Sequence, residues 1–220
     1  MKKLILTLAL LFGASSVAMA QDGAVSIRPH MGVYAPAYAL VQIDDGYHSH
    51  FEMGAGPLVG LGIDVNVLRP WVNLYGNFTG AFSRLHHSPV MELRDVDNPA
   101  SSRANIYMPT VGLFLAPAIG QIIPALGDLP IQPTVRLGLG AKLYDFDLWD
   151  RRGGLVSDFT GDLGFGFLTG AGPVSYSVEA RWAPSTFDAQ MLPIRAYGNT
   201  DQTQNDWFFQ MGMQLRPFTR

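Results

Sequence analysis

The stretch VRLGLGAKL, residues 135–143, alternates between two kinds of side chain. Its odd-numbered positions, from Val135 to Leu143, are apolar, whereas its even-numbered positions are Arg136, Lys142 and two glycines. Successive side chains of a β-strand point to opposite faces, so the stretch predicts a strand with one apolar and one polar face. In a soluble barrel the apolar face points inward, whereas in an outer-membrane barrel it faces lipid and the polar face lines the interior. The stretch by itself leaves both environments open.

The same alternation recurs along the chain and predicts eight strands. They cover residues 25–34, 58–67, 71–83, 106–118, 131–144, 158–168, 174–182 and 207–216. Most are close to the ~9 to 11 residues that a tilted strand needs to cross a bilayer. The sequence therefore predicts an all-β protein whose strands have membrane-spanning length.

The segments between these strands alternate in length. The long ones are 35–51, 84–104, 146–157 and 183–205, and the shorter ones are 68–70, 119–130 and 169–173. Outer-membrane barrels have long extracellular loops at one end and short periplasmic turns at the other. This rhythm favours a transmembrane barrel over a soluble one. Residues 119–130 are long and apolar for a periplasmic turn, and we expect them to form a hairpin extension.

Prolines lie in or beside several of the expected strands, at Pro29, Pro57, Pro109, Pro117 and Pro133. Proline has no N–H to donate to a ladder, and a closed barrel has no edge strand to hold it. We therefore expect these residues at strand ends or at local breaks in the pairing.

The first residues have the features of an export signal. Lys2 and Lys3 precede an apolar run that is too short to span a membrane, and an Ala-Met-Ala motif precedes Gln21. This predicts a cleaved signal peptide over residues 1–20 and a single barrel domain over residues 21–220.

The composition agrees with export and with contact to lipid. The chain has no cysteine, which argues against a disulfide-stapled secreted domain. Only 15 % of its residues are charged, whereas soluble domains have roughly 25 %. Without Lys2 and Lys3 the chain has 13 Lys and Arg against 18 Asp and Glu, a net charge of −5. This balance argues against nucleic-acid binding, which requires a basic surface.

The chain has a signal sequence, eight alternating runs, four long and three shorter connections, and a terminal strand from Trp207 to Phe218. In these features it resembles the small eight-stranded outer-membrane barrels of Gram-negative bacteria, the OmpX, OmpA-barrel and OmpW group. The resemblance implies an eight-stranded antiparallel barrel in the outer membrane with both termini in the periplasm. It also implies a monomer that is inserted by the barrel-assembly machinery and contacts outer-membrane lipids, including lipopolysaccharide. We expect no cofactor.

Charged residues fall on the polar face of the predicted strands and form the expected interior network. Its members are Arg28, Asp64, Arg136, Lys142, Asp158, Asp162, Glu179, Arg181 and Arg216. An eight-stranded barrel is just wide enough for side chains to fill, and buried charges there need partners. Across the turn at residues 170–173, Asp162 lies nearly opposite Arg181, which predicts an ion pair. The network is interpreted as a polar plug; the alternative is a gated passage.

Glycines also occupy the polar face, for example Gly138 and Gly140. They either leave space for a small ligand or admit large side chains from the other wall, such as Tyr75, Tyr144 and Phe208. We favour the second interpretation.

Aromatic residues near strand ends are interpreted as belts at the membrane interfaces. Tyr107, Trp182 and Trp207 are expected on one side, and Phe165, Phe167 and Tyr176 towards the other.

Four histidines fall in the first two long connections, at His48, His50, His86 and His87. Imidazole suits zinc and copper, so a surface metal site is one interpretation. Solvated loop histidines are the other, and we expect no metal site.

The segment His86-His87-Ser88 contains a His-x-Ser pair similar to that of PagL, a barrel enzyme that processes lipid A. Pro89 replaces the Asn that follows the motif in that family. Catalysis would require His86 and Ser88 to approach a carboxylate at the lipid boundary. We expect the protein not to be an enzyme.

The predicted function is that of a small outer-membrane protein in envelope integrity or surface interaction. It would act through four extracellular loops, residues 36–50, 84–104, 146–157 and 184–205, and through an extracellular ligand that the sequence does not identify. One alternative is a porin-like or OmpW-like passage for small or hydrophobic solutes, and another is a lipid A-modifying enzyme.

Overall fold

The computed structural model describes ten segments of the chain. They are residues 25–37, 41–42, 50–69, 71–88, 103–127, 129–148, 151–152, 156–170, 173–187 and 202–216. The expected signal peptide and most of the expected extracellular loops lie outside these residues. No helix within the described segments is long and apolar enough to cross a membrane.

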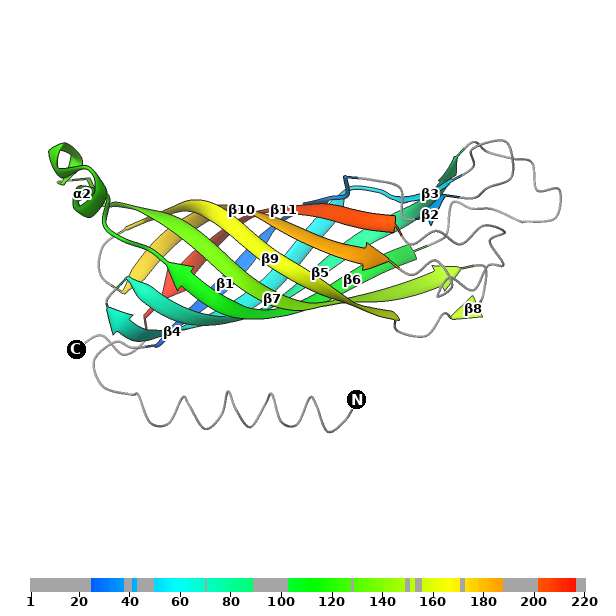
Figure 1. Cartoon of the computed structure of the whole chain (residues 1–220), viewed down its shortest axis with the longest axis horizontal. Helices are drawn as coiled ribbons and strands as arrows, with labels where there is room; N and C mark the ends of the chain where they lie inside the picture. Colours follow the sequence, from blue (N-terminus) through cyan, green and yellow to red (C-terminus); the bar gives the residue numbers. More distant parts are fainter. Residues whose placement is uncertain are drawn as a thin grey trace.

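Eight long strands form a closed barrel (Figure 1). They are β1 (Val25–Ala35), β4 (Gly56–Arg69), β5 (Val72–Ser88), β6 (Arg103–Leu115), β7 (Ile131–Leu148), β9 (Val156–Thr169), β10 (Val174–Phe187) and β11 (Gln202–Leu215). Each pairs antiparallel with the next, and β1 closes the ring by pairing with both β4 and β11. The predicted fold class is therefore confirmed. Closure satisfies the backbone groups that lipid cannot hydrogen-bond.

Three short strands lie at one end of the barrel (Figure 1). They are β2 (Val41–Gln42), β3 (His50–Met53) and β8 (Arg151–Arg152). β3 pairs with the end of β5, and β8 pairs with the end of β7. At the opposite end, β4 connects to β5 and β9 to β10 through short turns. The end with short turns is periplasmic and the end with the long connections is extracellular.

Strand ends differ from the sequence prediction in several places. β5 continues to Ser88, β7 to Leu148 and β10 to Phe187, into segments that the sequence assigned to loops. The prediction of loops starting at residues 84, 146 and 184 is therefore wrong. The reason for β5 and β7 is tertiary, because β3 and β8 supply further ladder partners.

The connection between β6 and β7 is helical. It contains α2 (Ile119–Ile122) and the 3₁₀-helix η2 (Pro124–Leu126) and projects beyond the periplasmic end of the barrel (Figure 1). The side chains of Ile122 and Ile123 are exposed. The hairpin extension expected over residues 119–130 is thus a short helical excursion with an apolar surface.

The stretch that alternates between residues 135 and 143 lies in β7 and has the two faces that its sequence predicts. Leu137 and Leu139 point outward and are 60 % and 55 % exposed, whereas Arg136 and Lys142 are fully buried. The other strands follow the same rule. The outer wall carries a belt of exposed apolar side chains, and the interior holds nearly all of the buried polar ones. Lipid is the environment that stabilises such an outer wall.

Three prolines inside strands coincide with breaks in one ladder. Pro29 lacks a partner on β11, Pro109 lacks one on β7 and Pro184 lacks one on β9, although the register is unchanged on either side of each break. Each keeps its partner on the other neighbour, for example Leu61 for Pro29 and Phe78 for Pro109. The barrel therefore accepts proline by giving up pairing locally rather than by ending a strand.

Candidate functional site

The periplasmic part of the interior begins with an ion pair between β1 and β4. The Arg28 guanidinium lies 3.0 Å from the Asp64 carboxylate, and both side chains are buried. Ser26 and Gln214 also donate to this carboxylate, at 3.4 Å each. The guanidinium lies 4.3 Å from the ring centre of Phe114, which covers its face.

A second ion pair joins two strands that are not neighbours in the barrel. Arg136 on β7 donates two hydrogen bonds, at 2.8 and 2.9 Å, to Glu179 on β10. The strand between them, β9, presents Gly164, where a Cβ would lie 2.8 Å from a Glu179 oxygen and 3.2 Å from the Arg136 Cβ. The glycine therefore makes room for the pair. Gln210 donates to Glu179 at 2.7 Å, and Tyr75 lies under the Arg136 guanidinium at 4.4 Å.

A third ion pair joins β10 and β9, and its arginine also reaches across the lumen. Arg181 donates to both carboxylate oxygens of Asp162 at 2.9 Å, which is the pair that the sequence predicts. The same guanidinium donates to Thr79 on β5 at 3.0 Å and to Thr110 on β6 at 3.3 Å. The Tyr75 hydroxyl donates to Asp162 at 2.5 Å. Because β10 and β5 lie on opposite sides of the ring, these bonds join opposite walls.

A fourth pair lies nearer the extracellular end. Lys142 Nζ contacts Asp206 at 2.7 Å, Ser185 Oγ at 3.0 Å and the Ala183 carbonyl at 2.5 Å. The Tyr34 hydroxyl donates to Asp206 at 3.0 Å. Arg136 and Lys142 thus have separate partners at two heights of the interior.

The rest of the extracellular half is mainly apolar. Its buried cluster consists of Tyr34, Met53, Leu58, Ala81, Leu85, Ala104, Ile106, Met108, Tyr144, Phe146, Ala183, Phe187 and Phe208. The rings of Tyr144 and Phe146 stack at 5.7 Å, and Phe187 packs edge-on against both. Side chains, rather than an open channel, fill this part of the barrel.

Most of the predicted interior network is buried inside the barrel. Its buried members are Arg28, Asp64, Arg136, Lys142, Asp162, Glu179 and Arg181. The other two are only half-buried. Asp158 lies opposite Lys142 in the β7–β9 register, and Arg216 follows β11 and donates to Gln214 at 3.3 Å.

Asp206 was missed because the prediction began the last strand at Trp207, whereas β11 begins at Gln202. The alternation of Gln204, Asp206 and Phe208 with outward residues was the available signal. At Gly138 a Cβ would lie 2.1 Å from the Tyr75 hydroxyl. This glycine therefore admits a large side chain from another strand, as the sequence interpretation favours.

Two aromatic residues that the prediction places in different belts are in contact. Phe165, Phe167 and Tyr176 point outward and are exposed, and Tyr107, Trp182 and Trp207 are half-buried. The ring of Phe165 lies 6.4 Å from that of Trp207, which the sequence placed in the other belt. In the register Phe165 lies opposite Ala180 and Trp207 lies opposite Trp182, so the two rings flank β10 at positions two residues apart.

The His-x-Ser segment lies at the end of β5. The register with β3 places Glu52 opposite His86 and His50 opposite Ser88. The side chains of these histidines and of Ser88, and His48 altogether, lie outside what the structure describes. The absence of catalysis and of a metal site therefore stays a prediction.

Comparison with known proteins supports the fold. No protein-family model matches the chain, and no curated protein matches it. Among solved structures, Neisserial surface protein A is similar over 88 % of this chain and 97 % of its own, with 9 % identity and a TM-score of 0.57. Ail of Yersinia pestis matches over 87 % of this chain and 96 % of its own, with 14 % identity and a TM-score of 0.41. The first likeness and the apolar outer wall identify the fold as that of a small outer-membrane barrel.

Proposed function

We propose that this protein is a closed, non-enzymatic outer-membrane barrel that acts through its extracellular surface in envelope integrity or surface interaction. The observation that carries the proposal is the bridging of the lumen by Arg181, which bonds to Asp162 on its own wall and to Thr79 on the opposite one.

The energetics of the bridge support a closed state. Arg181 and Asp162 are both fully buried. Separating a buried ion pair leaves uncompensated charges, which costs about 3 to 5 kcal/mol per broken pair. A solute passing through the lumen has to displace this pair and the Arg136–Glu179 pair. Thermal motion therefore opens such a path only rarely.

The extracellular half supports the same conclusion for a different reason. Its cluster is lined mainly by apolar side chains, which cannot replace the hydration shell of an ion, so entry carries a desolvation cost. For hydrophobic solutes, the OmpW-like alternative requires a lateral opening. Every neighbouring pair of the eight long strands is hydrogen-bonded within the described residues, which supports a wall without such an opening.

With the lumen filled, the parts left to act are the long extracellular connections. Loops on a rigid scaffold are where binding residues concentrate, because they vary without disturbing the core. The protein would present these loops as a monomer to an extracellular ligand or to neighbouring envelope components.

The test is single-channel recording from refolded residues 21–220 in a planar bilayer. We expect no conductance steps from protein shown to be folded by heat-modifiable electrophoretic mobility. A matched variant, Arg181→Ser/Asp162→Ser, removes the bridge together with its partner and is expected to show small steps. Steady conductance steps from the native barrel would contradict this proposal and would favour a transport function.

Two further measurements complete the test. Replacing residues 89–102 and 188–201 with short turns should leave the barrel assembled but abolish its effect on detergent resistance or on surface binding of cells.

Mass spectrometry of lipid A from cells expressing the native chain and the Ser88→Ala variant tests for catalysis, since Glu52 lies opposite His86 in the register. We expect identical lipid A from both.

A further inference from the structure

The β6–β7 connection carries exposed apolar side chains at the periplasmic end of the barrel. It covers residues 116–130, which we call the periplasmic arm, whereas residues 70–71 and 170–173 join the other strand pairs at this end. No residue of α2 or η2 is buried. The side chains of Ile122, Ile123, Leu126 and Leu129 are 56, 46, 36 and 46 % exposed. Apolar side chains gathered in this way on a surface mark a site of contact with another molecule or with a membrane.

The backbone of the periplasmic arm holds it in a compact shape. The Ile123 N–H donates to the Ile119 carbonyl at 2.7 Å, and the Leu126 N–H donates to the Ile123 carbonyl at 2.9 Å. A Cβ on Gly120 would lie 2.5 Å from the Gly127 Cα, so α2 and the end of η2 are in backbone contact. The arm therefore forms backbone hydrogen bonds within itself, as a lipid environment requires, and leaves its aliphatic side chains exposed.

The periplasmic arm continues the lipid-facing wall. It begins after Leu115, which lies opposite Val135 in the β6–β7 register, and Val135 is an exposed member of the apolar belt. Figure 1 shows α2 beyond the strand ends and outside the outline of the barrel. Lipid surrounds the outer wall, so this position places the arm beside the periplasmic leaflet.

The base of the arm lies near the membrane interface. Ile131, which follows the arm, lies opposite Thr169 on β9, and Thr169 lies opposite Tyr176 on β10. Tyr176 is thus two strands away, about 10 Å, and its side chain is exposed on the outer wall. Tyrosine is enriched at membrane–water interfaces because its ring is apolar and its hydroxyl is polar. The arm therefore starts and ends within reach of the lipid headgroups and acyl chains.

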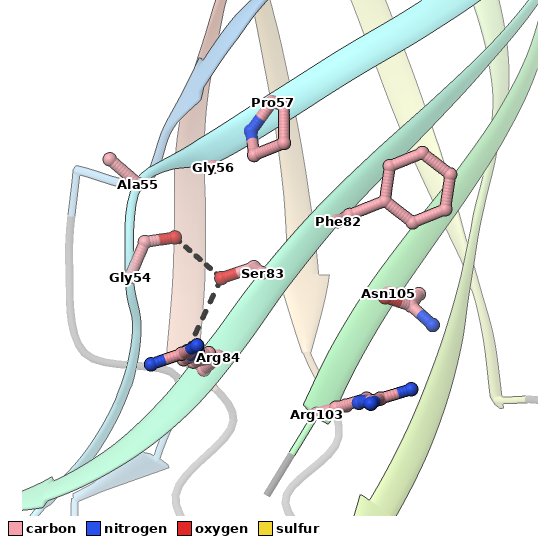
Figure 2. Close-up of a pocket in the computed structure, with 9 residues that line it drawn as sticks. All are labelled: Gly54, Ala55, Gly56, Pro57, Phe82, Ser83, Arg84, Arg103 and Asn105. Atoms are coloured by element: carbon pink, nitrogen blue, oxygen red, sulfur yellow. Dashed lines mark hydrogen bonds between the residues drawn. The ribbon is translucent and has the colours of Figure 1, made fainter. Parts of the chain in front are cut away.

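The two ends of β6 differ in polarity. Figure 2 shows Phe82 of the apolar belt with Arg84, Arg103 and Asn105 around a groove at the extracellular rim. The outer face of β5 and β6 thus changes from apolar to charged as the strands leave the membrane. The periplasmic end shows no such change, because residues 104–127 contain no charged side chain and Asp128 is the single charge of the arm. The apolar surface of the barrel therefore extends into the arm.

We propose that the periplasmic arm is an interfacial anchor, which inserts its exposed aliphatic side chains among the phospholipids of the periplasmic leaflet. Elements that lie in the interface bury their apolar side chains at the boundary between headgroups and acyl chains. This contact removes apolar surface from water and so stabilises the inserted arm. Because the arm joins β6 to β7, it fixes the depth of the barrel on one side of the ring. The inference rests on the location of the barrel in the outer membrane and not on the closed lumen.

The first test measures the depth of the arm by fluorescence quenching. The chain has no cysteine, so Ile123→Cys can carry one fluorophore on refolded residues 21–220 in phosphatidylcholine vesicles. Leu137→Cys on the apolar belt is the reference for lipid. Thr203→Cys is the reference for water, since Thr203 is exposed and lies beyond Trp207 towards the extracellular end. We expect phosphatidylcholine with brominated acyl chains to quench the labels at residues 123 and 137 similarly and the label at residue 203 weakly. Iodide on both sides of the membrane should give the reverse order.

Two results of this test would overturn the proposal. Quenching of the label at residue 123 by iodide, but not by brominated lipid, would place the arm in water. Protection from both quenchers would place the arm against protein, and chemical cross-linking would then show whether a second copy of the chain covers it.

The second test needs no label and compares unfolding in the same vesicles. Ile122→Ser/Ile123→Ser/Leu126→Ser removes aliphatic side chains that are exposed on the protein itself. We expect this variant to unfold at a lower urea concentration than the native barrel, whereas a connection that only links two strands predicts no change.

Gln121→Ser/Ala125→Ser is the matched control for this comparison. It also places serines at exposed positions of α2 and η2, but it removes no large aliphatic side chain. We expect it to keep the native midpoint of urea unfolding. An unchanged midpoint for the triple serine variant, or an equal loss in both variants, would contradict the proposal.

Discussion

The two halves of the barrel interior exclude water by different means. The periplasmic half contains Arg28–Asp64, Arg136–Glu179 and Arg181–Asp162, joined by amide and hydroxyl groups. The described part of the extracellular half is a mainly apolar cluster with one embedded ion pair, Lys142–Asp206. A network of buried ions depends on each partner and so specifies which strands lie together, whereas apolar side chains fill volume and tolerate exchange of similar shapes.

The largest expected effect comes from breaking the polar half at one partner. Asp162→Ala leaves the buried Arg181 without its carboxylate and removes the acceptor of the Tyr75 hydroxyl. We expect a loss of about 3 to 5 kcal/mol in the free energy of unfolding. Urea unfolding in lipid vesicles, followed by tryptophan fluorescence, measures it.

The control for this prediction is Asp162→Ala/Arg181→Ala, which removes both charges. It should recover part of the lost stability because no uncompensated ion remains. If Asp162→Ala alone were as stable as the native barrel, the stability of the polar half would not depend on its ion pairs.

A smaller loss of stability is expected from placing an extra side-chain atom in the polar half. At Gly164 a new Cβ would lie 2.8 Å from Glu179 Oε1 and 3.1 Å from Arg181 Cγ, so Gly164→Ala forces the ion pairs to shift. Overpacking of this kind costs about 1 to 3 kcal/mol. Gly80→Ala is the matched control, since its nearest neighbour would lie at 3.7 Å, an ordinary contact. Equal unfolding midpoints for the two variants would contradict the assigned role of Gly164.

The smallest effect on stability is expected from replacing the ion pair of the extracellular half. Lys142→Met/Asp206→Leu replaces this pair with apolar side chains that match the surrounding cluster. The Tyr34 hydroxyl loses Asp206 as an acceptor but keeps the Met53 sulfur, 3.8 Å away. Such replacements are often neutral or stabilising, so we expect a change within about 1 kcal/mol of the native value. The corresponding change in the polar half, Arg136→Met/Glu179→Leu, should be clearly destabilising, because Gln210 then loses its acceptor. Similar losses for both double variants would remove the distinction between the halves.

The sequence predicts the wall of the barrel well and its ends poorly. The alternation of residues 135–143 identifies which side chains of β7 face lipid, and the same rule places Arg28 and Glu179 inside. It does not predict the extra length of β5 and β7, since that depends on β3 and β8 pairing with them. The contact between Phe165 and Trp207 was also missed, because residues at different positions along their strands meet once the strands tilt around the barrel.

By itself, the sequence determined the number of spanning strands, the face that each side chain occupies and the end of the barrel that carries long loops. These properties are local, because the period of two and the length of each run are fixed by neighbouring residues. Only the tertiary structure decided which charges are partners, as in the pair of Arg136 and Glu179 across Gly164. Those contacts depend on the register between strands and on closure of the ring, which join residues far apart in the chain.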